Sequence, residues 1–231
     1  MYLTKHVFIL TLFAAFTAIC FGRDSIPPEM HPDAGAWPDL FEPDLSNAIQ
    51  AEGVWTFENG VLTAAEDRNI WSQKVYDNFI LDLEFKTAEG TNSGVVVYCG
   101  DPENWIPNSV EIQIADDYAE QWAGADKTWR CGAIFGHLAA SEQRVKKPGL
   151  WNRMTVTCMD RDIWVMLNGE TVTHMDMGLW TSGKKNPDGT DIPPWLSTPF
   201  AELPTNGRIG FQGKHAGAPI YFRKIKILEL E

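Results

Sequence analysis

Short runs in which apolar and polar residues alternate recur along the chain from about residue 55 to its end. In residues 79–86, Phe79, Leu81, Leu83 and Phe85 alternate with a largely polar set, and this period of two predicts a strand with one buried face. Residues 95–98 form a β-branched run suited to a central strand. Nowhere is the 3.6-residue period of a long helix convincing. Further strands are predicted at 110–115, 154–159, 163–167, 170–175, 207–212 and 220–230.

Two Asn-Gly pairs predict hairpins between neighbouring runs. Asn59-Gly60 joins the two halves of residues 55–63, and Asn168-Gly169 joins 163–167 to 170–175. Both residue types tolerate the positive φ that a tight two-residue turn requires. About ten short strands separated by Gly, Pro and Asn predict an all-β fold, a sandwich or jelly roll in a single domain. Its bent sheets would leave one concave face.

The start of the chain has the pattern of an export signal. Lys5 precedes an apolar run at residues 7–21, and small side chains at Cys20 and Gly22 suit cleavage after residue 22. We expect a signal peptide at 1–22 and a secreted or periplasmic protein. Lipidation of Cys20 is the alternative, which the bulky Ile19 before it disfavours. Residues 23–52 contain five prolines and are expected to be an extended N-terminal segment, ordered near 37–41, before a domain at 53–231.

Net charge argues against some classes of partner. The formal charge is -12, and removal of a leader whose one charge is Lys5 makes it -13, since -12 - 1 = -13. Such a surface repels phosphate backbones and anionic lipids, whereas a neutral carbohydrate is indifferent to it. Solubility alone also explains an acidic surface. The oligomeric state is left open by the sequence.

The cysteines do not form a recognisable metal motif. Cys99, Cys131 and Cys158 remain after the predicted cleavage, without a Cys-x-x-Cys or zinc-type Cys/His spacing. Each lies in an apolar run. We therefore expect buried free thiols, although one disulfide is possible in an exported protein.

Two segments between predicted strands are long enough to be functional. They cover residues 115–130 and 176–204, and the second holds two tryptophans and several prolines that would order it as a lid or rim. The chain has ten tryptophans. Sugars stack their C–H faces on aromatic rings, although any single tryptophan is more often a packing residue. The four in loop-like sequence are placed near a ligand: Trp105, Trp122, Trp129 and Trp195.

Several polar residues within the predicted strands are candidates for a catalytic or binding role. Glu111 and Gln113 project from the same side of one strand, which must face solvent or a cleft. His215 follows a glycine-containing strand end and is a candidate general base, although a lone loop histidine is more often a bystander. Gln212 and Arg223 either line a cleft or are paired in the core.

The order of several short motifs resembles the 3-keto-disaccharide hydrolase family over about residues 55–228. No single motif is specific to this family, but the order and spacing of the motifs across one domain are specific to it. The motifs are the opening hairpin at 55–62, the strand at 77–85, the Asn92-Ser93-Gly94 turn, Glu111-Ile112-Gln113-Ile114, residues 132–135, 147–152 and 167–169, Gly210-Phe211-Gln212 with His215, and 222–225.

This resemblance implies a concanavalin-A-like jelly roll and a distinct chemistry. The substrate would already be a ketone at C3 of a glucoside, so that a base removes the acidified C2 hydrogen and the C1 substituent leaves. His215 or Glu111 would be the base and the other would assist the leaving group, while Asn92, Gln113 and Gln212 hold hydroxyls or the enolate. A divalent cation, calcium or magnesium, could share that stabilisation, although the sequence does not demand one.

Two departures from the family pattern and two rival functions accompany this resemblance. Tyr98 stands where members of this family commonly carry an arginine, and Ala115 interrupts their usual Gln-Ile-Leu-Asp run. Both residues are expected to touch the cleft. One rival is a laminarinase-like glycosidase using Glu111 and Asp116 on unoxidised glucans, which Gln113 disfavours. The other is a lectin-like module that binds glycans without chemistry.

Overall fold

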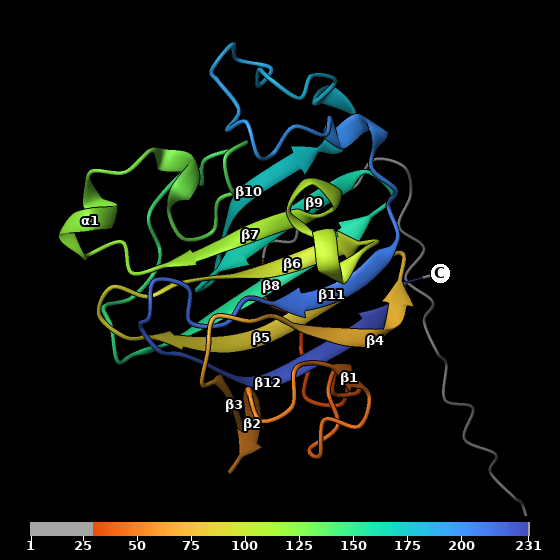
Figure 1. Ribbon diagram of the computed structural model, residues 1–231, viewed down its shortest axis with the longest axis vertical. Helices are drawn as coiled ribbons and strands as arrows, with labels where there is room; N and C mark the ends of the chain where they lie inside the picture. Colours follow the sequence, from red (N-terminus) through yellow and green to blue (C-terminus); the bar gives the residue numbers. More distant parts are fainter. Residues whose placement is uncertain (1–29, 231) are drawn as a thin grey trace, which may run out of the picture.

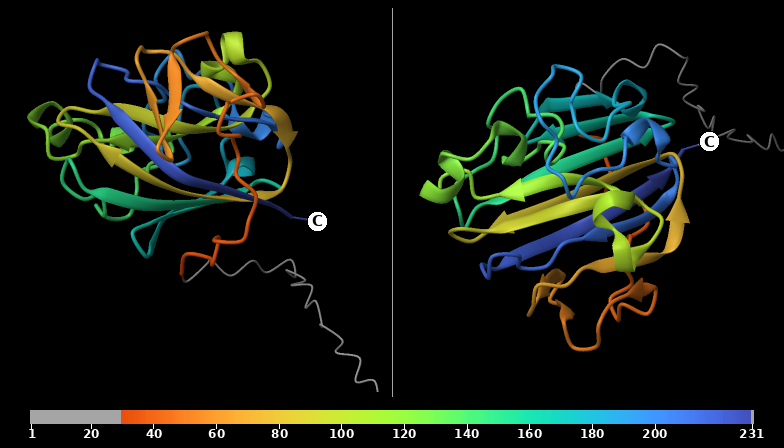
Figure 2. Two further views of the ribbon diagram at one scale, coloured as in Figure 1. Left: turned by 90° about the horizontal axis from the view of Figure 1, so that it is seen from below. Right: turned by 45° about the horizontal axis from the view of Figure 1, so that its top comes forward.

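The computed structural model describes residues 30–230, which form two antiparallel sheets packed face to face (Figure 1). Figure 2 shows the two layers edge-on in its left view. The five-stranded sheet has the order β1-β4-β11-β6-β7 and the seven-stranded sheet the order β10-β9-β8-β5-β12-β3-β2. The predicted all-β sandwich is therefore confirmed. The strands are β1 Ala48–Ile49, β2 Trp55–Glu58, β3 Val61–Ala64, β4 Ile70–Tyr76, β5 Phe79–Thr87, β6 Asn92–Cys99, β7 Val110–Ala115, β8 Trp151–Met159, β9 Asp162–Leu167, β10 Glu170–Asp176, β11 Gly207–Phe211 and β12 Ile220–Glu229.

The two predicted hairpins occur where the Asn-Gly pairs stand. Asn59 and Gly60 have φ of 52° and 75° between β2 and β3, and Asn168 and Gly169 have φ of 51° and 95° between β9 and β10. These left-handed conformations match the right-handed twist of the strands they join. The turn residues thus fix both registers.

The core lies between the inner faces of the two sheets. Phe211 of β11 stacks on Phe222 of β12 with ring centroids 4.6 Å apart, and Phe79 of β5 contacts Tyr98 of β6 edge-on at 6.3 Å. Each pair joins one sheet to the other. Alternation along the strands therefore sends one set of side chains into this core and the next set outward.

The N-terminal segment contacts the sandwich from residue 31 onward. Leu40 and Phe41 are buried, and the Phe41 ring meets Phe211 edge-on at 5.7 Å. His31 Nδ1 bonds Thr155 Oγ1 at 2.7 Å, and its Nε2 accepts the Gly169 N–H at 2.9 Å. The part of this segment near Phe41 therefore packs on the sandwich. The predicted signal peptide at 1–22 lies outside the described residues.

Three details differ from the sequence-based expectations. Strands β1 and β4 were not predicted, because β1 has two residues and Ser72, Gln73 and Lys74 obscure the pattern of β4. Asn92-Ser93-Gly94 opens strand β6 rather than forming a turn. Tyr98, expected at the cleft, is buried in the core, where a φ of 58° breaks the alternation of β6.

The long segments contain only short helices. Between β7 and β8 lie α1 (Glu120–Ala123) and a 3₁₀ turn at Lys127–Trp129; further 3₁₀ turns occur at Pro102–Asn104, Ile106–Asn108, Met177–Leu179 and Phe200–Glu202. Cys99, Cys131 and Cys158 are buried free thiols, as predicted. Over residues 30–230, no helix combines the length and apolarity needed to cross a membrane.

Candidate functional site

The outer face of the five-stranded sheet gathers most of the predicted polar residues. Register places Glu111 beside Val96, and Gly210 beside both Val96 and Trp71, so these four form one row across β7, β6, β11 and β4. Trp71, Val96 and Cys99 pack together as a cluster separate from the core, with Trp105 against them. The face is therefore partly covered by aromatic side chains. The polar residues next to this row are Gln113, Gln212, Asn92 and His215.

Gly94 is the centre of this polar group. It pairs with Gln113 on β7, and its carbonyl accepts the Gln212 N–H at 2.9 Å from the other side. A methyl group at Gly94 would overlap the Glu111 carboxyl group. The missing side chain of Gly94 thus leaves the space in which the Glu111 carboxyl lies, between the two glutamines.

Glu111 is a partly buried carboxyl without a counter-charge among the described residues. Burial raises the pKa of its carboxyl to about 8, because a low-dielectric surrounding disfavours the carboxylate. Within residues 30–230 no hydrogen bond or ion pair to this carboxyl offsets the burial. A carboxyl with a pKa this close to neutrality can exchange a proton with a ligand.

Beside Gly94, one hydrogen bond joins the side chains of Gln113 and Asn92, and another fixes the backbone of Gln212. Gln113 Nε2 donates to Asn92 Oδ1 at 3.0 Å, and Ser93 Oγ donates to the Gln212 carbonyl at 2.7 Å. Gln212 is only 8% exposed, yet its Oε1 has no hydrogen-bond partner in the described part of the chain. Such an atom loses its hydration without compensation. A ligand hydroxyl would satisfy it.

His215 stands at the edge of the same face. It bridges to Asn92, and its Nδ1 lies 2.8 Å from Asp67 Oδ2. Both side chains are about half exposed. The aspartate fixes one ring nitrogen and leaves Nε2 for a ligand.

A cavity adjoins this group on the β4 side. Trp71 and Trp105 form an aromatic wall, with ring centroids 6.1 Å apart. The buried Asn69 Nδ2 also has no partner among the described residues, so one cavity holds an unpaired donor beside the unpaired acceptor of Gln212. A sugar hydroxyl both donates and accepts. The residues that line this cavity include Asn69, Trp71, Trp105, Gln212 and His215.

The remaining predicted residues lie elsewhere. Trp129 and Trp195 line a second cavity, and Trp122 is a partly buried residue of α1 whose Nε1 has no partner within residues 30–230. Arg223 is on the seven-stranded sheet, where Nε donates to Glu84 Oε2 at 2.6 Å and the guanidinium lies 4.0 Å from the Trp151 ring centre. The structure therefore does not bring Arg223 to the Glu111 face, since β12 turns Phe222 inward and Arg223 away from the core.

Asp116 does not form a carboxylate pair with Glu111. It is buried, and its two oxygens accept the N–H groups of Gly90 at 3.0 Å and Tyr118 at 3.1 Å. The extended stretch from Glu111 to Ala115 alone covers about 13 Å. Paired carboxyls of glycosidases lie only about 5–9.5 Å apart. Asp116 is a turn-stabilising residue here.

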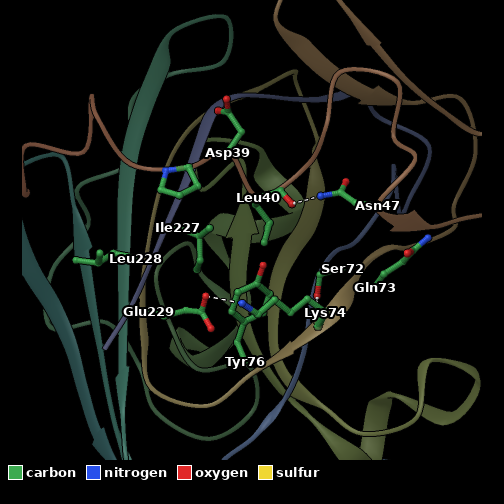
Figure 3. Close-up of a pocket in the computed structure, with 11 residues that line it drawn as sticks. Asp39, Leu40, Asn47, Ser72, Gln73, Lys74, Tyr76, Ile227, Leu228 and Glu229 are labelled. Atoms are coloured by element: carbon green, nitrogen blue, oxygen red, sulfur yellow. Dashed lines mark hydrogen bonds and ion pairs between the residues drawn. The ribbon is translucent and has the colours of Figure 1, made fainter. Parts of the chain in front are cut away.

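In a different hollow at the edge of the sandwich, several of the lining polar groups pair with protein groups (Figure 3). Lys74 Nζ pairs with Glu229 Oε1 at 2.5 Å, and Asn47 Nδ2 donates to the Leu40 carbonyl at 3.1 Å. These groups satisfy one another. We do not assign this hollow a ligand.

Sequence reasoning missed Asn69, Trp71, Asp67 and the role of Gly94. The first three belong to, or directly precede, a strand that was not predicted, so no periodicity pointed to them. Gly94 stood in a recognised motif but was interpreted as a turn residue. In residues 30–230, no three His, Cys, Asp or Glu side chains gather as metal ligands would, so we derive no step through a cation.

Comparison with known proteins identifies the family of this chain. Residues 36–228 match the 3-keto-alpha-glucoside-1,2-lyase-like domain. The chain belongs to this family. The family match confirms the resemblance found in the motifs, and it includes β4 with Asn69 and Trp71 as well as the Glu111 strand.

Solved structures extend the comparison. A proposed glycosyl hydrolase from Parabacteroides distasonis is 57% identical, covering 84% of this chain and 99% of that one, with a TM-score of 0.82. A second from the same organism is 22% identical with a TM-score of 0.67, covering 81% of this chain and 90% of that one. A Bacillus subtilis protein of unknown function with a galectin-like fold is 14% identical with a TM-score of 0.53, covering 83% and 93%. A search of curated proteins finds no match. The family and the 57% identical relative together support a carbohydrate-active protein.

Proposed function

We propose that this protein is an enzyme that cleaves 3-keto-glycosides by removing the C2 hydrogen and expelling the C1 substituent. The base takes the C2 proton, and the C2–H electron pair forms an enolate with the C3 ketone. Collapse of the enolate forms the C1=C2 double bond and breaks the C1–O bond, and the departing oxygen gains a proton. Water then adds across the double bond, so that the net result is hydrolysis.

One observation carries this proposal: Glu111 is an unpaired carboxyl with a pKa raised to about 8. A hydrogen next to a ketone is a weak acid, so its removal favours a stronger base than an ordinary carboxylate. Desolvation supplies that strength. Glu111 is therefore our choice for the base, in preference to His215.

The groups around Gly94 suit a neutral sugar. The carboxamides of Gln113 and Gln212 flank Glu111, where they would orient hydroxyls or donate to the developing enolate oxygen. The indole of Trp105 offers a face for C–H stacking. A net charge of -12 leaves binding of a neutral sugar undisturbed.

His215 is assigned to the leaving group. His215 lies two residues along β6 and one strand spacing across from Gly94, a straight-line separation of about 8 Å. That separation spans one sugar ring. Asp67 Oδ2 lies 2.8 Å from His215 Nδ1 and orients the ring, so that Nε2 would pass a proton to the departing oxygen.

The rival glycosidase mechanism is disfavoured by Asp116, whose oxygens are engaged by backbone amides. A lectin-like module would bind sugars without turnover. We also propose export, from the leader pattern at residues 1–22. Mass spectrometry of the protein isolated from its native cells would then find Arg23 as the first residue.

Turnover assays separate these functions. Purified protein is incubated with a 3-keto-glucoside and with the same glucoside unoxidised, and release of the aglycone is followed. We expect release from the 3-keto compound alone, and its loss in Glu111→Gln. Release from the unoxidised glucoside would favour the glycosidase, and binding without any release would favour the lectin.

A further inference from the structure

A second cavity lies between the two long segments that precede β8 and β11. Figure 1 draws these two segments in green and in blue. Its walls come from residues 126–139 and 186–195. The right view of Figure 2 brings these segments forward. None of the groups assigned above to the cleavage reaction lines this cavity.

Two tryptophans form an aromatic platform in this cavity. The rings of Trp129 and Trp195 lie 6.5 Å apart at 63°, and Trp195 is 52% exposed. Trp129 also packs on Phe135 at 5.5 Å. An indole kept half in solvent retains a face on which a ligand can stack.

His137 lines the same cavity and has a buried, unused acceptor. It is 4% exposed and stacks on Phe200 with ring centroids 3.9 Å apart. Its Nδ1 lies 2.8 Å from the Phe135 carbonyl, so Nδ1 carries the hydrogen and donates. The neutral ring then has a lone pair on Nε2, which has no partner in the described part of the chain. Stacking explains the ring's position but not this nitrogen.

Other polar groups of the cavity are already engaged. Asn186 Oδ1 accepts from Trp180 Nε1 at 2.9 Å, and its Nδ2 donates to Thr190 Oγ1 at 3.1 Å. Asp126 and Asp188 each accept an N–H and a hydroxyl two residues later. These carboxylates stabilise the loops and leave the rim negative.

We propose that this cavity binds a neutral pyranose residue of an oligosaccharide, stacked on Trp195, with a hydroxyl donating to His137 Nε2. The apolar face and the lone acceptor are the two features that a pyranose complements. The negative rim disfavours uronic acids and sulfated sugars. Because such binding needs no 3-keto group, the inference goes beyond the proposed function.

The two sites adjoin each other. The Phe135 N–H donates to the Glu111 carbonyl at 2.9 Å, and Phe135 carries Trp129 on its ring. A glycan lying across Phe135 would reach from the Glu111 carboxyl to Trp195. The cavity therefore holds a residue distant from the cleaved bond and favours substrates longer than a disaccharide.

The test measures binding apart from chemistry. Calorimetry is performed on Glu111→Gln protein with unoxidised α-1,4-, β-1,3- and β-1,4-glucotetraoses and with tetragalacturonate. We expect at least one neutral tetrasaccharide to bind, with affinity reduced at least tenfold by a second change, Trp195→Ala or His137→Phe. The phenylalanine keeps the stacking on Phe200 and removes the acceptor. Trp37→Ala, in the N-terminal segment, is the control and should leave affinity unchanged.

Turnover separates the outcomes. Trp195→Ala in the wild-type background should cleave a 3-keto-glucoside with a small aglycone at the normal rate. If no neutral tetrasaccharide binds below millimolar concentration, or if Trp195→Ala leaves affinity intact, the inference is overturned. Failure of wild-type protein to cleave any 3-keto-glycoside would instead overturn the proposed function and leave the binding result standing.

Discussion

At the scale of single residues, Glu111 and Gly94 depend on each other. The carboxyl of Glu111 lies where the side chain of any other residue at position 94 would stand. Burial in that space raises the pKa of Glu111, and the side chains that flank it are neutral glutamines, not cations. The raised pKa of Glu111 and its position over Gly94 thus both result from the packing of this carboxyl on a glycine.

The pH dependence of cleavage follows from the Glu111 pKa. Because the base must be ionised, its active fraction grows as pH rises through about 8. We expect kcat/KM to climb between pH 6 and 9 with a midpoint near that value, measured with a 3-keto-glucoside. A rate that is constant over this range would contradict the assignment of Glu111 as base.

Gly94→Ala tests the packing of the carboxyl directly. The added methyl group overlaps the carboxyl, which must move, so we expect kcat/KM to fall about 10²-fold from misplacement alone. The melting temperature should change little, because the glutamate side chain can rotate. Gly100→Ala is the matched control, since an added methyl there meets nothing within 4 Å. Equal activity in the two variants would remove the role given to Gly94.

At the scale of elements, local chemistry predicted hairpins well and isolated strands poorly. Asn59-Gly60 and Asn168-Gly169 specify their turns without help from the rest of the fold. Strand β4 is held instead by pairing with β1 and β11, and Ser72, Gln73 and Lys74 conceal its periodicity. The site residues Asn69 and Trp71 were missed for that reason.

The N-terminal segment is an element whose stability depends on a few buried side chains. Phe41→Ala removes a ring that is 1% exposed and packs on Phe211, so we expect the free energy of unfolding to fall by about 3–5 kcal/mol. Met30→Ala, at a side chain 74% exposed, should change it by less than about 0.5 kcal/mol. Denaturant titration of both variants measures this. A small effect at Phe41 would mean that the segment is not part of the cooperative fold.

At the scale of the whole molecule, the stacking of two sheets decides which predicted residues can act together. Glu111, Gln113, Asn92, Gln212 and His215 share one outer face, because β7, β6 and β11 are neighbours. Arg223 satisfies the same alternation rule but belongs to the other layer. Periodicity tells inward from outward within a strand, whereas the choice of sheet depends on long-range pairing that local sequence does not encode.

The order of the strands also separates the two cavities. The β4 edge carries Trp71 and its neighbours, and the segment paired with the β7 edge carries Phe135. Glu111, on β7, lies between β4 and the segment that carries Phe135. The proposed reacting centre therefore has aromatic side chains on both sides, a layout suited to a glycan that crosses the sheet.

The most direct test of the account is the fate of the C2 hydrogen. A 3-keto-glucoside carrying deuterium at C2 is compared with the unlabelled compound at saturating concentration. If Glu111 removes this hydrogen in the slow step, the deuterated substrate reacts several-fold more slowly, and Glu111→Gln cleaves neither. In D₂O, the product from unlabelled substrate should gain deuterium at C2. Equal rates for both substrates, with the original C2 hydrogen retained in the product, would contradict the mechanism.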